Sequence, residues 1–174
     1  MSKKRLVSLS LVLFLGLCTV SQADVEDKYL QTQHLAIPIK GQLKDSRILG
    51  HEPSKGSCEE GEKNYFVFKG STQDLNDFTN KVTIIDTWKR LSEIKNKYLE
   101  SGLLNKITSA DFSEYNFAVA LIVFTGTQHL ENGRLYKDKN KLYFSYEIWE
   151  EQLDVRPACA WERLYVFKLR KRSL

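Results

Sequence analysis

The acidic side chains near the end of one predicted strand are the first candidates for chemistry. Glu147, Glu150, Glu151 and Asp154 lie close together in the sequence. Paired carboxylates can act as general acid and general base in hydrolysis. Neighbouring acids are also common on solvated surfaces, so a carboxylate-dependent hydrolase of the envelope is retained only as an alternative.

Motifs for covalent, metal-dependent or phosphoryl-transfer chemistry are missing from the sequence. It contains no Gly-x-Ser-x-Gly elbow, no His-Glu-x-x-His pair and no phosphate-binding loop. The acidic run Cys58–Glu62 is more typical of a solvated turn than of a cation site, and His34 and His51 have no partner at ligand spacing. We therefore expect no catalytic residue, no metal site and no cofactor.

Aromatic residues outside the predicted core are the candidate binding residues. Trp149 and Tyr143 fall on the polar side of a predicted strand, Trp161 falls in a predicted loop, and His129 falls in the loop Thr127–Gly133. Aromatic side chains in such places are enriched at protein interfaces. The predicted binding residues are Trp149, Trp161 and His129, and the loops that carry recognition are Thr127–Gly133 and Gln152–Trp161.

The stretch Tyr115–Thr125 is predicted to be the central strand that positions these residues. It has no charge and is rich in β-branched and aromatic residues, which is typical of a strand covered on both faces. One face is bulky, with Phe117, Val119, Leu121 and Val123. The other begins with Ala118 and Ala120, and small side chains there favour close packing of a helix.

The remaining elements follow from local patterns. Val82–Ile85 reads as a short strand, and Asp86 or Thr87 can cap a helix whose apolar face includes Trp88 and Leu91. If Val82–Ile85 is parallel to the central strand, the crossover should be right-handed. Further strands are predicted at 64–69, 134–136, 141–150 and 163–169, with the pair Asn132-Gly133 in a turn.

These elements predict an α+β fold with one mixed, mostly antiparallel sheet and one packed helix. Three segments organise the chain: a signal peptide at 1–23, an extended N-terminal arm at 24–57, and a single domain at 58–174. The arm is rich in polar residues, includes Pro38 and Pro53, and could form short strands at Leu35–Ile37 and Arg47–Leu49.

The N-terminal segment has the layout of a secretory signal peptide. A basic cluster, Lys3–Arg5, precedes the apolar run Leu6–Val20, and Ser21-Gln22-Ala23 places small residues at the cleavage site. The run is shorter than the ~20 residues that span a bilayer, which disfavours a membrane anchor. Lipidation at Cys18 is a further alternative, although Leu17 fits the usual pattern poorly. We expect a periplasmic or secreted protein with no membrane span after cleavage.

Processing after Ala23 changes the charge and the cysteine count. It removes three of the 26 basic residues and none of the 22 acidic ones, so the mature chain carries a net charge of +1. Nucleic-acid binding therefore gains little support. Two cysteines remain, Cys58 and Cys159, and an even count in an exported chain favours one disulfide between them.

The order of elements also resembles a known family. The residues that carry the resemblance are Trp88, Asp111, Phe112 and the apolar strand Phe117–Phe124 with Gly126. Over about residues 82–168 the chain resembles the C-terminal domain of PrcB-type subunits, which are small exported accessory proteins of a secreted protease complex. The loop 126–133 departs from the turn that this family usually has. The resemblance implies an accessory role, another envelope or secreted protein as partner, and no catalytic residues.

The sequence leaves one expected function and two alternatives. The expected function is an exported accessory or interaction protein of the cell envelope without catalytic activity. The alternatives are a small-ligand-binding protein and the carboxylate-dependent hydrolase.

Overall fold

The structure is a computed structural model that describes residues 30–39, 42–54, 65–125, 128–150 and 160–172. Its strands are β1 (Leu30–Ile37), β2 (Gln42–Pro53), β3 (Phe66–Phe68), β4 (Val82–Ile85), β5 (Leu99–Ser101), β6 (Tyr115–Thr125), β7 (Gln128–Asp138), β8 (Lys141–Glu150) and β9 (Ala160–Arg170). Its helices are α1 (Thr72–Phe78), α2 (Trp88–Lys97), α3 (Gly102–Asn105) and the 3-10 helix η1 (Ser109–Ser113).

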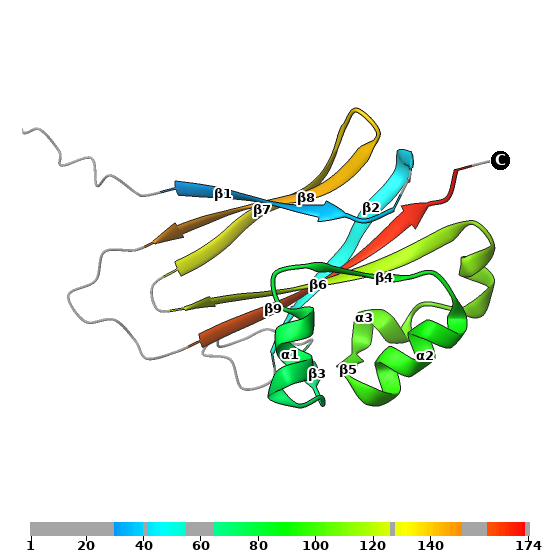
Figure 1. Cartoon of the computed structure of the whole chain (residues 1–174), viewed down its shortest axis with the longest axis horizontal. Helices are drawn as coiled ribbons and strands as arrows, with labels where there is room; N and C mark the ends of the chain where they lie inside the picture. Colours follow the sequence, from blue (N-terminus) through cyan, green and yellow to red (C-terminus); the bar gives the residue numbers. More distant parts are fainter. Residues whose placement is uncertain (1–29, 40–41, 55–64, 126–127, 151–159, 173–174) are drawn as a thin grey trace, which may run out of the picture.

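The described strands form three antiparallel sheets rather than one mixed sheet. A three-stranded sheet has the order β1-β8-β7, a four-stranded sheet has the order β2-β9-β6-β4, and β3 pairs with β5. The two larger sheets face each other, and the helices lie on the far side of the four-stranded sheet (Figure 1). The predicted fold of one sheet with one packed helix is therefore wrong.

Strand β6 lies inside the four-stranded sheet and is covered on both faces, as its uncharged sequence indicates. The small residues Ala118 and Ala120 pack in the core between the two sheets, together with Phe144 and Phe167. The bulky residues, including Phe117, pack in the second core against the helices. The expectation that a helix would lie on the alanine face is therefore wrong. Aromatic side chains of the opposite sheet fill the space that the alanines leave.

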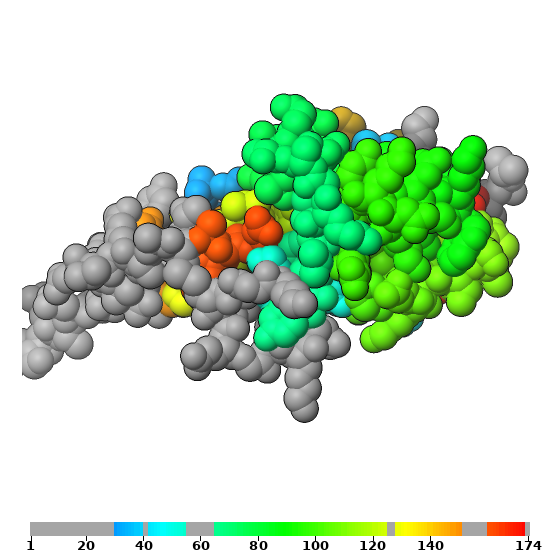
Figure 2. Space-filling view, turned by 90° about the horizontal axis from the view of Figure 1, so that it is seen from below, coloured from blue at the N-terminus to red at the C-terminus, as the bar shows by residue number. Residues whose placement is uncertain are grey.

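The helical layer is larger than the sequence analysis expects. Helix α2 begins as predicted, with Thr87 Oγ1 accepting a hydrogen bond from the Arg90 N–H at 3.2 Å, and Leu91 is fully buried. Trp88 is 43% exposed and does not join the core. Residues Thr72–Phe78, where the sequence analysis predicts no helix, form helix α1, which Ser71 caps. Figure 2 views the molecule from the side on which these helices, coloured green, cover the sheet.

Strand β4 runs antiparallel to β6. Val82 lies opposite Ala120 and Ile85 lies opposite Phe117. A right-handed crossover through the helix would require β4 and β6 to be parallel, so that prediction does not apply. Helix α2 instead leads to β5 and α3 before the chain returns to β6.

The segment treated above as an N-terminal arm contributes a strand to each large sheet. Strand β1 pairs with β8 along its whole length, and β2 pairs with β9 from Gln42 to Pro53 with two register shifts. Both strands carry residues into the cores, such as Ile37 and Leu49. Cys58 and Cys159 lie outside the described residues.

Strand β7 extends through the region predicted to be a loop. Asn132 has a φ of 52°, and two residues, Asn132 and Gly133, lie opposite one residue of β8. Such a β-bulge lets a strand continue past a sequence that otherwise favours a turn. Within the described residues, no helix is long and apolar enough to cross a membrane.

Candidate functional site

The side of the three-stranded sheet that points away from the core is the candidate site, and we call it the outer face. On the other side of the same sheet, side chains such as Leu142, Phe144 and Tyr146 are buried in the core between the two large sheets. Because successive side chains along a strand point to opposite sides of the sheet, the residues next to these buried ones point outward. The outer face consists of Leu30, Thr32, His34 and Ala36 from β1; Tyr143, Ser145, Glu147 and Trp149 from β8; and His129, Glu131, Arg134 and Tyr136 from β7.

One end of the outer face carries two of the predicted binding residues in contact. Trp149 and His129 lie opposite each other on β8 and β7. Their rings are stacked, with centroids 4.1 Å apart and planes within 12°. On the other flank Trp149 lies opposite Leu30, which is 56% exposed. His129 is a strand residue rather than a loop residue.

The other end of the outer face carries a second group of rings. Tyr136 and Tyr143 lie opposite each other and stack, with centroids 5.2 Å apart. His34 meets Tyr136 edge-on at 5.6 Å, although their strands are separated by β8. Between those strands Ser145 is only 1% exposed, although it points outward. The small serine allows the two rings to meet above it, which makes a continuous ring surface.

Acidic and polar groups separate the two groups of rings. Glu147 lies opposite Glu131 on β7 and opposite Thr32 on β1. The Asn132 side-chain amide donates a hydrogen bond to Glu147 Oε2 at 2.5 Å. Like charges directly opposite each other across two strands are unfavourable. The centre of the outer face therefore holds two carboxylates with one guanidinium, Arg134, in the next row, and a second cation placed there would relieve the remaining repulsion.

Trp161, the third predicted binding residue, does not join this surface. It lies on β9 opposite Phe124, and the two rings stack with centroids 6.3 Å apart and planes within 3°. Trp161 is half-buried and packs against the core between the sheets. Its contacts are those of a residue that closes one end of the core.

The carboxylates that suggest a hydrolase are only partly described. Glu147 lies on the outer face and Glu150 lies opposite Gln128, whereas Glu151 and Asp154 are outside the described residues. Glu147 and Glu131 lie directly opposite each other on the outer face, and Glu147 accepts a hydrogen bond from the Asn132 side chain. Within the part of the chain that the structure describes, no group of three His, Cys, Asp or Glu residues is placed to hold a metal ion.

His34, Tyr136 and Leu30 are members of the outer face that the sequence analysis does not select. A weak signal for His34 exists, because Leu35 and Ile37 are two residues apart and would share one side of a strand, with His34 on the other side. That spacing predicts which side His34 occupies if the segment is a strand. It does not predict that β1 pairs with β8, which brings His34 to Tyr136.

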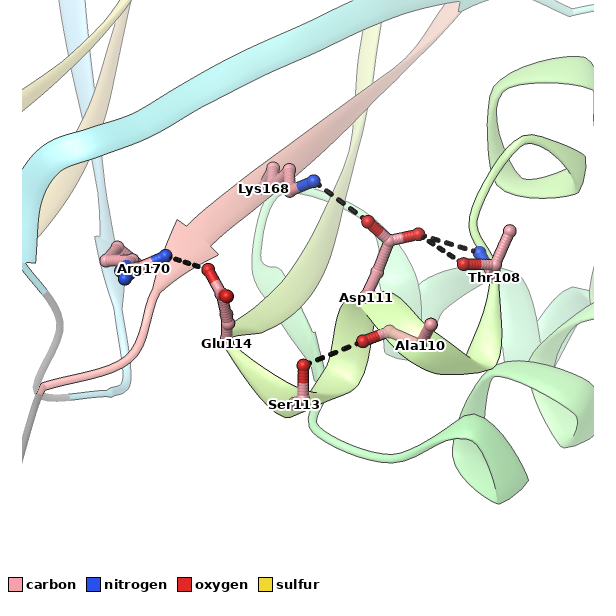
Figure 3. Close-up of polar contacts among 7 residues, drawn as sticks. All are labelled: Thr108, Ala110, Asp111, Ser113, Glu114, Lys168 and Arg170. Carbon is pink, nitrogen blue, oxygen red and sulfur yellow. Dashed lines mark hydrogen bonds and ion pairs between the residues drawn. The ribbon is translucent and has the colours of Figure 1, made fainter.

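A second polar cluster joins η1 to β9 (Figure 3). It lies on the side of the four-stranded sheet that faces the helices. Lys168 Nζ lies 2.9 Å from Asp111 Oδ1, and Asp111 Oδ2 accepts hydrogen bonds from the Thr108 hydroxyl at 2.7 Å and from the Thr108 N–H at 3.0 Å. The Lys168 ammonium, followed by these Thr108 contacts, lowers the pKa of Asp111 to about 2. Arg170 pairs with Glu114 at the end of the same strand.

Comparison with known proteins found no matching family model, no matching curated protein and no matching solved structure.

Proposed function

We propose that this chain is an exported, non-catalytic interaction protein of the cell envelope that binds another exported protein through its outer face. The observation that carries the proposal is the pair of ring groups, Trp149 with His129 and Tyr136 with Tyr143, on the sheet face that points away from both cores. Stacked rings of this kind bury a large area on contact and lose little side-chain entropy, so they are effective anchors for a partner.

The spacing and charge of the outer face suggest what the partner offers. Tyr143 and Trp149 are six residues apart on β8, which places them about 20 Å apart at the rise of a strand. Glu131 and Glu147 lie between them. A complementary surface has apolar side chains at both ends and a lysine or arginine at the centre, where it pairs with the two carboxylates.

Export is part of the proposal and rests on the layout of residues 1–23. N-terminal sequencing or intact mass of exported material should give a chain that begins at Asp24. A lipid-modified species that begins at Cys18 would contradict cleavage after Ala23. The resemblance to PrcB-type subunits makes a component of a secreted protease complex the first partner to test.

Photo-crosslinking in the native envelope tests the interaction directly. A photoreactive phenylalanine analogue in place of Tyr143 should give one dominant crosslinked product, which mass spectrometry identifies. The same analogue in place of Trp88 is the matched control. Trp88 is an exposed tryptophan on the helical side of the molecule, and its position should not give that product.

Purified components then give the energetics. Trp149→Ala should weaken binding of the crosslinked partner at least tenfold and leave the thermal midpoint within a few degrees, because the ring lies outside both cores. Trp88→Ala should leave affinity unchanged. Loss of binding in Trp88→Ala but not in Trp149→Ala would move the interface to the helical side and refute the proposal.

A further inference from the structure

A small cavity lies between the four-stranded sheet and the segment that contains α3 and η1. It has a volume of about 250 Å³. Strands β2 and β9 contribute Arg47 and Lys168, and the helical segment contributes Lys106 and Asp111. No residue of the outer face lines it, so an inference about this cavity is independent of the proposed function.

The charges around the cavity do not balance. Arg47 lies directly opposite Lys168 on the neighbouring strand, an arrangement that is unfavourable without nearby anions. Asp111 pairs with Lys168 at 2.9 Å. Arg47 and Lys106 form no ion pair with any described residue. Three cationic side chains therefore surround the cavity with one carboxylate between them.

The remaining wall of the cavity is apolar. Phe117 and Ile107 are 1% and 4% exposed, and Leu103 is half-buried beside them. Lys168 bridges the two kinds of surface, because its ammonium lies 5.9 Å from the Phe117 ring centroid. An apolar wall with cations at its rim suits a molecule that has a hydrocarbon body and one anionic end.

We propose that this cavity binds a small monocarboxylate with an apolar body. The carboxylate would accept hydrogen bonds from the Arg47 guanidinium and the Lys106 ammonium, and the body would lie against Phe117 and Leu103. A water molecule occupies about 30 Å³ of liquid, so the cavity has room for about eight groups of that size, and a medium-chain monocarboxylate would fill it. Arginine is well suited to such an end group, because its planar guanidinium can hold a carboxylate with two parallel hydrogen bonds.

Calorimetric titration with octanoate, a monocarboxylate with ten non-hydrogen atoms, tests the proposal. Octanoate should bind the mature protein with one-to-one stoichiometry. Octylammonium, which has the same chain and the opposite charge, should give no saturable heat at the same ionic strength. Dodecanoate should bind no more tightly than octanoate, because its additional carbons would lie outside the cavity.

Variants then locate the site. Arg47→Gln and Lys106→Gln should each weaken octanoate binding at least fivefold. Lys44→Gln is the matched control, since it removes one exposed charge from the same strand without lining the cavity, and it should leave binding unchanged. Thermal midpoints of all three variants confirm that they are folded.

Three results would overturn the proposal. They are equal binding of octanoate and octylammonium, octanoate binding that neither Arg47→Gln nor Lys106→Gln weakens, and the absence of saturable octanoate binding to the folded protein. None of these results bears on the crosslinking experiment at the outer face.

Discussion

Glu52 is buried, although glutamate is usually an exposed residue. It lies on β2 and is 1% exposed. One carboxyl oxygen accepts a hydrogen bond from the Ser101 hydroxyl at 2.5 Å, and the other accepts from the Leu103 N–H at 2.9 Å. Ser101 Oγ in turn accepts from the Leu104 N–H at 3.2 Å. Glu52 therefore ties the edge of the sheet to the start of helix α3.

Replacing Glu52 should separate this hydrogen-bonding role from simple packing. We expect Glu52→Ala to lower the free energy of unfolding by about 2 to 4 kcal/mol, because it leaves two buried donors unpaired. Glu52→Gln should recover most of the loss, since its amide oxygen can still accept from Leu103 and the Ser101 hydroxyl can accept from its amide nitrogen. Urea denaturation of the three proteins measures the difference. Equal losses in both variants would show that an amide cannot replace the carboxylate in these hydrogen bonds.

Asp111 should make stability depend on pH at the acid end. Its pKa is about 2 in the folded protein, below the ordinary value of 3.8, because of Lys168 and Thr108. A lowered pKa stabilises the folded state above pH 3.8, and this contribution disappears as the pH falls through about 2. Asp111→Asn should lower the free energy of unfolding at pH 7 by about 1 to 2 kcal/mol, allowing for a carboxylate that is 27% exposed.

The matched control for Asp111 is an exposed carboxylate with a cationic partner. Asp77 lies 3.7 Å from Lys81, and both side chains are more than half exposed. Asp77→Asn should change stability by only a few tenths of a kcal/mol at any pH, as exposed pairs usually do. A difference between wild type and Asp111→Asn that stays constant from pH 7 to pH 2 would refute the assigned pKa.

At the scale of elements, the bulge in β7 keeps the outer face intact. Without its additional residue, the part of β7 on one side of Asn132 and Gly133 would point its side chains to the wrong face of the sheet, since a shift of one residue reverses the alternation. With the bulge, His129 and Tyr136 both point outward although they are seven positions apart. The same bulge places the Asn132 amide against Glu147.

Gly133 should tolerate no side chain at this bulge. An added Cβ would lie 3.1 Å from Tyr165 Cε1 and 3.3 Å from Phe144 Cε2. Both rings are buried and in contact with centroids 4.7 Å apart, so they have little room to move. Gly133→Ala should lower the free energy of unfolding by about 1 to 3 kcal/mol through overpacking.

A double-mutant cycle distinguishes overpacking at Gly133 from a general effect on the strand. Phe144→Leu removes part of the ring that the new methyl group would meet. The cost of Gly133→Ala should therefore be smaller in the Phe144→Leu background than in the wild type. Equal costs in the two backgrounds would place the strain at Tyr165, the nearer ring, rather than at Phe144.

At the scale of the whole molecule, the disulfide predicted from the cysteine count would join the two segments that adjoin β2 and β9. The Ser54 N–H donates a hydrogen bond to the Glu162 carbonyl at 3.0 Å. Cys58 is four residues beyond Ser54, and Cys159 directly precedes Ala160 at the start of β9.

We expect non-reducing peptide mapping of exported protein to show Cys58 linked to Cys159. The bridge would close a loop of about 100 residues, and the chain-entropy model predicts about 4 to 5 kcal/mol of stabilisation. Cys58→Ser, Cys159→Ser and the double variant should lose equal stability, because any of them removes the same bond. Two thiols that react freely with an alkylating agent in natively exported protein would contradict the prediction.

The sequence by itself determined the elements whose signal is local. The uncharged run Tyr115–Thr125 is a central strand with both faces buried, and β8 buries Leu142, Phe144 and Tyr146 as its alternation predicts. Thr87 caps α2. These features depend on residues within one turn or one strand of each other, so composition and period are sufficient to identify them.

Only the tertiary structure decided which layers cover these elements. A buried face on β6 requires apolar neighbours but does not specify a helix or a sheet, and here the sheet lies on the alanine side. Four of the eight residues in segment 30–37 are apolar but do not alternate regularly with polar ones, and the segment forms a strand by pairing along the edge of β8. That pairing brings His34 to Tyr136, and the bulge at Asn132 brings His129 to Trp149. Both contacts join residues of different strands, and such pairings follow from the packing of the whole chain.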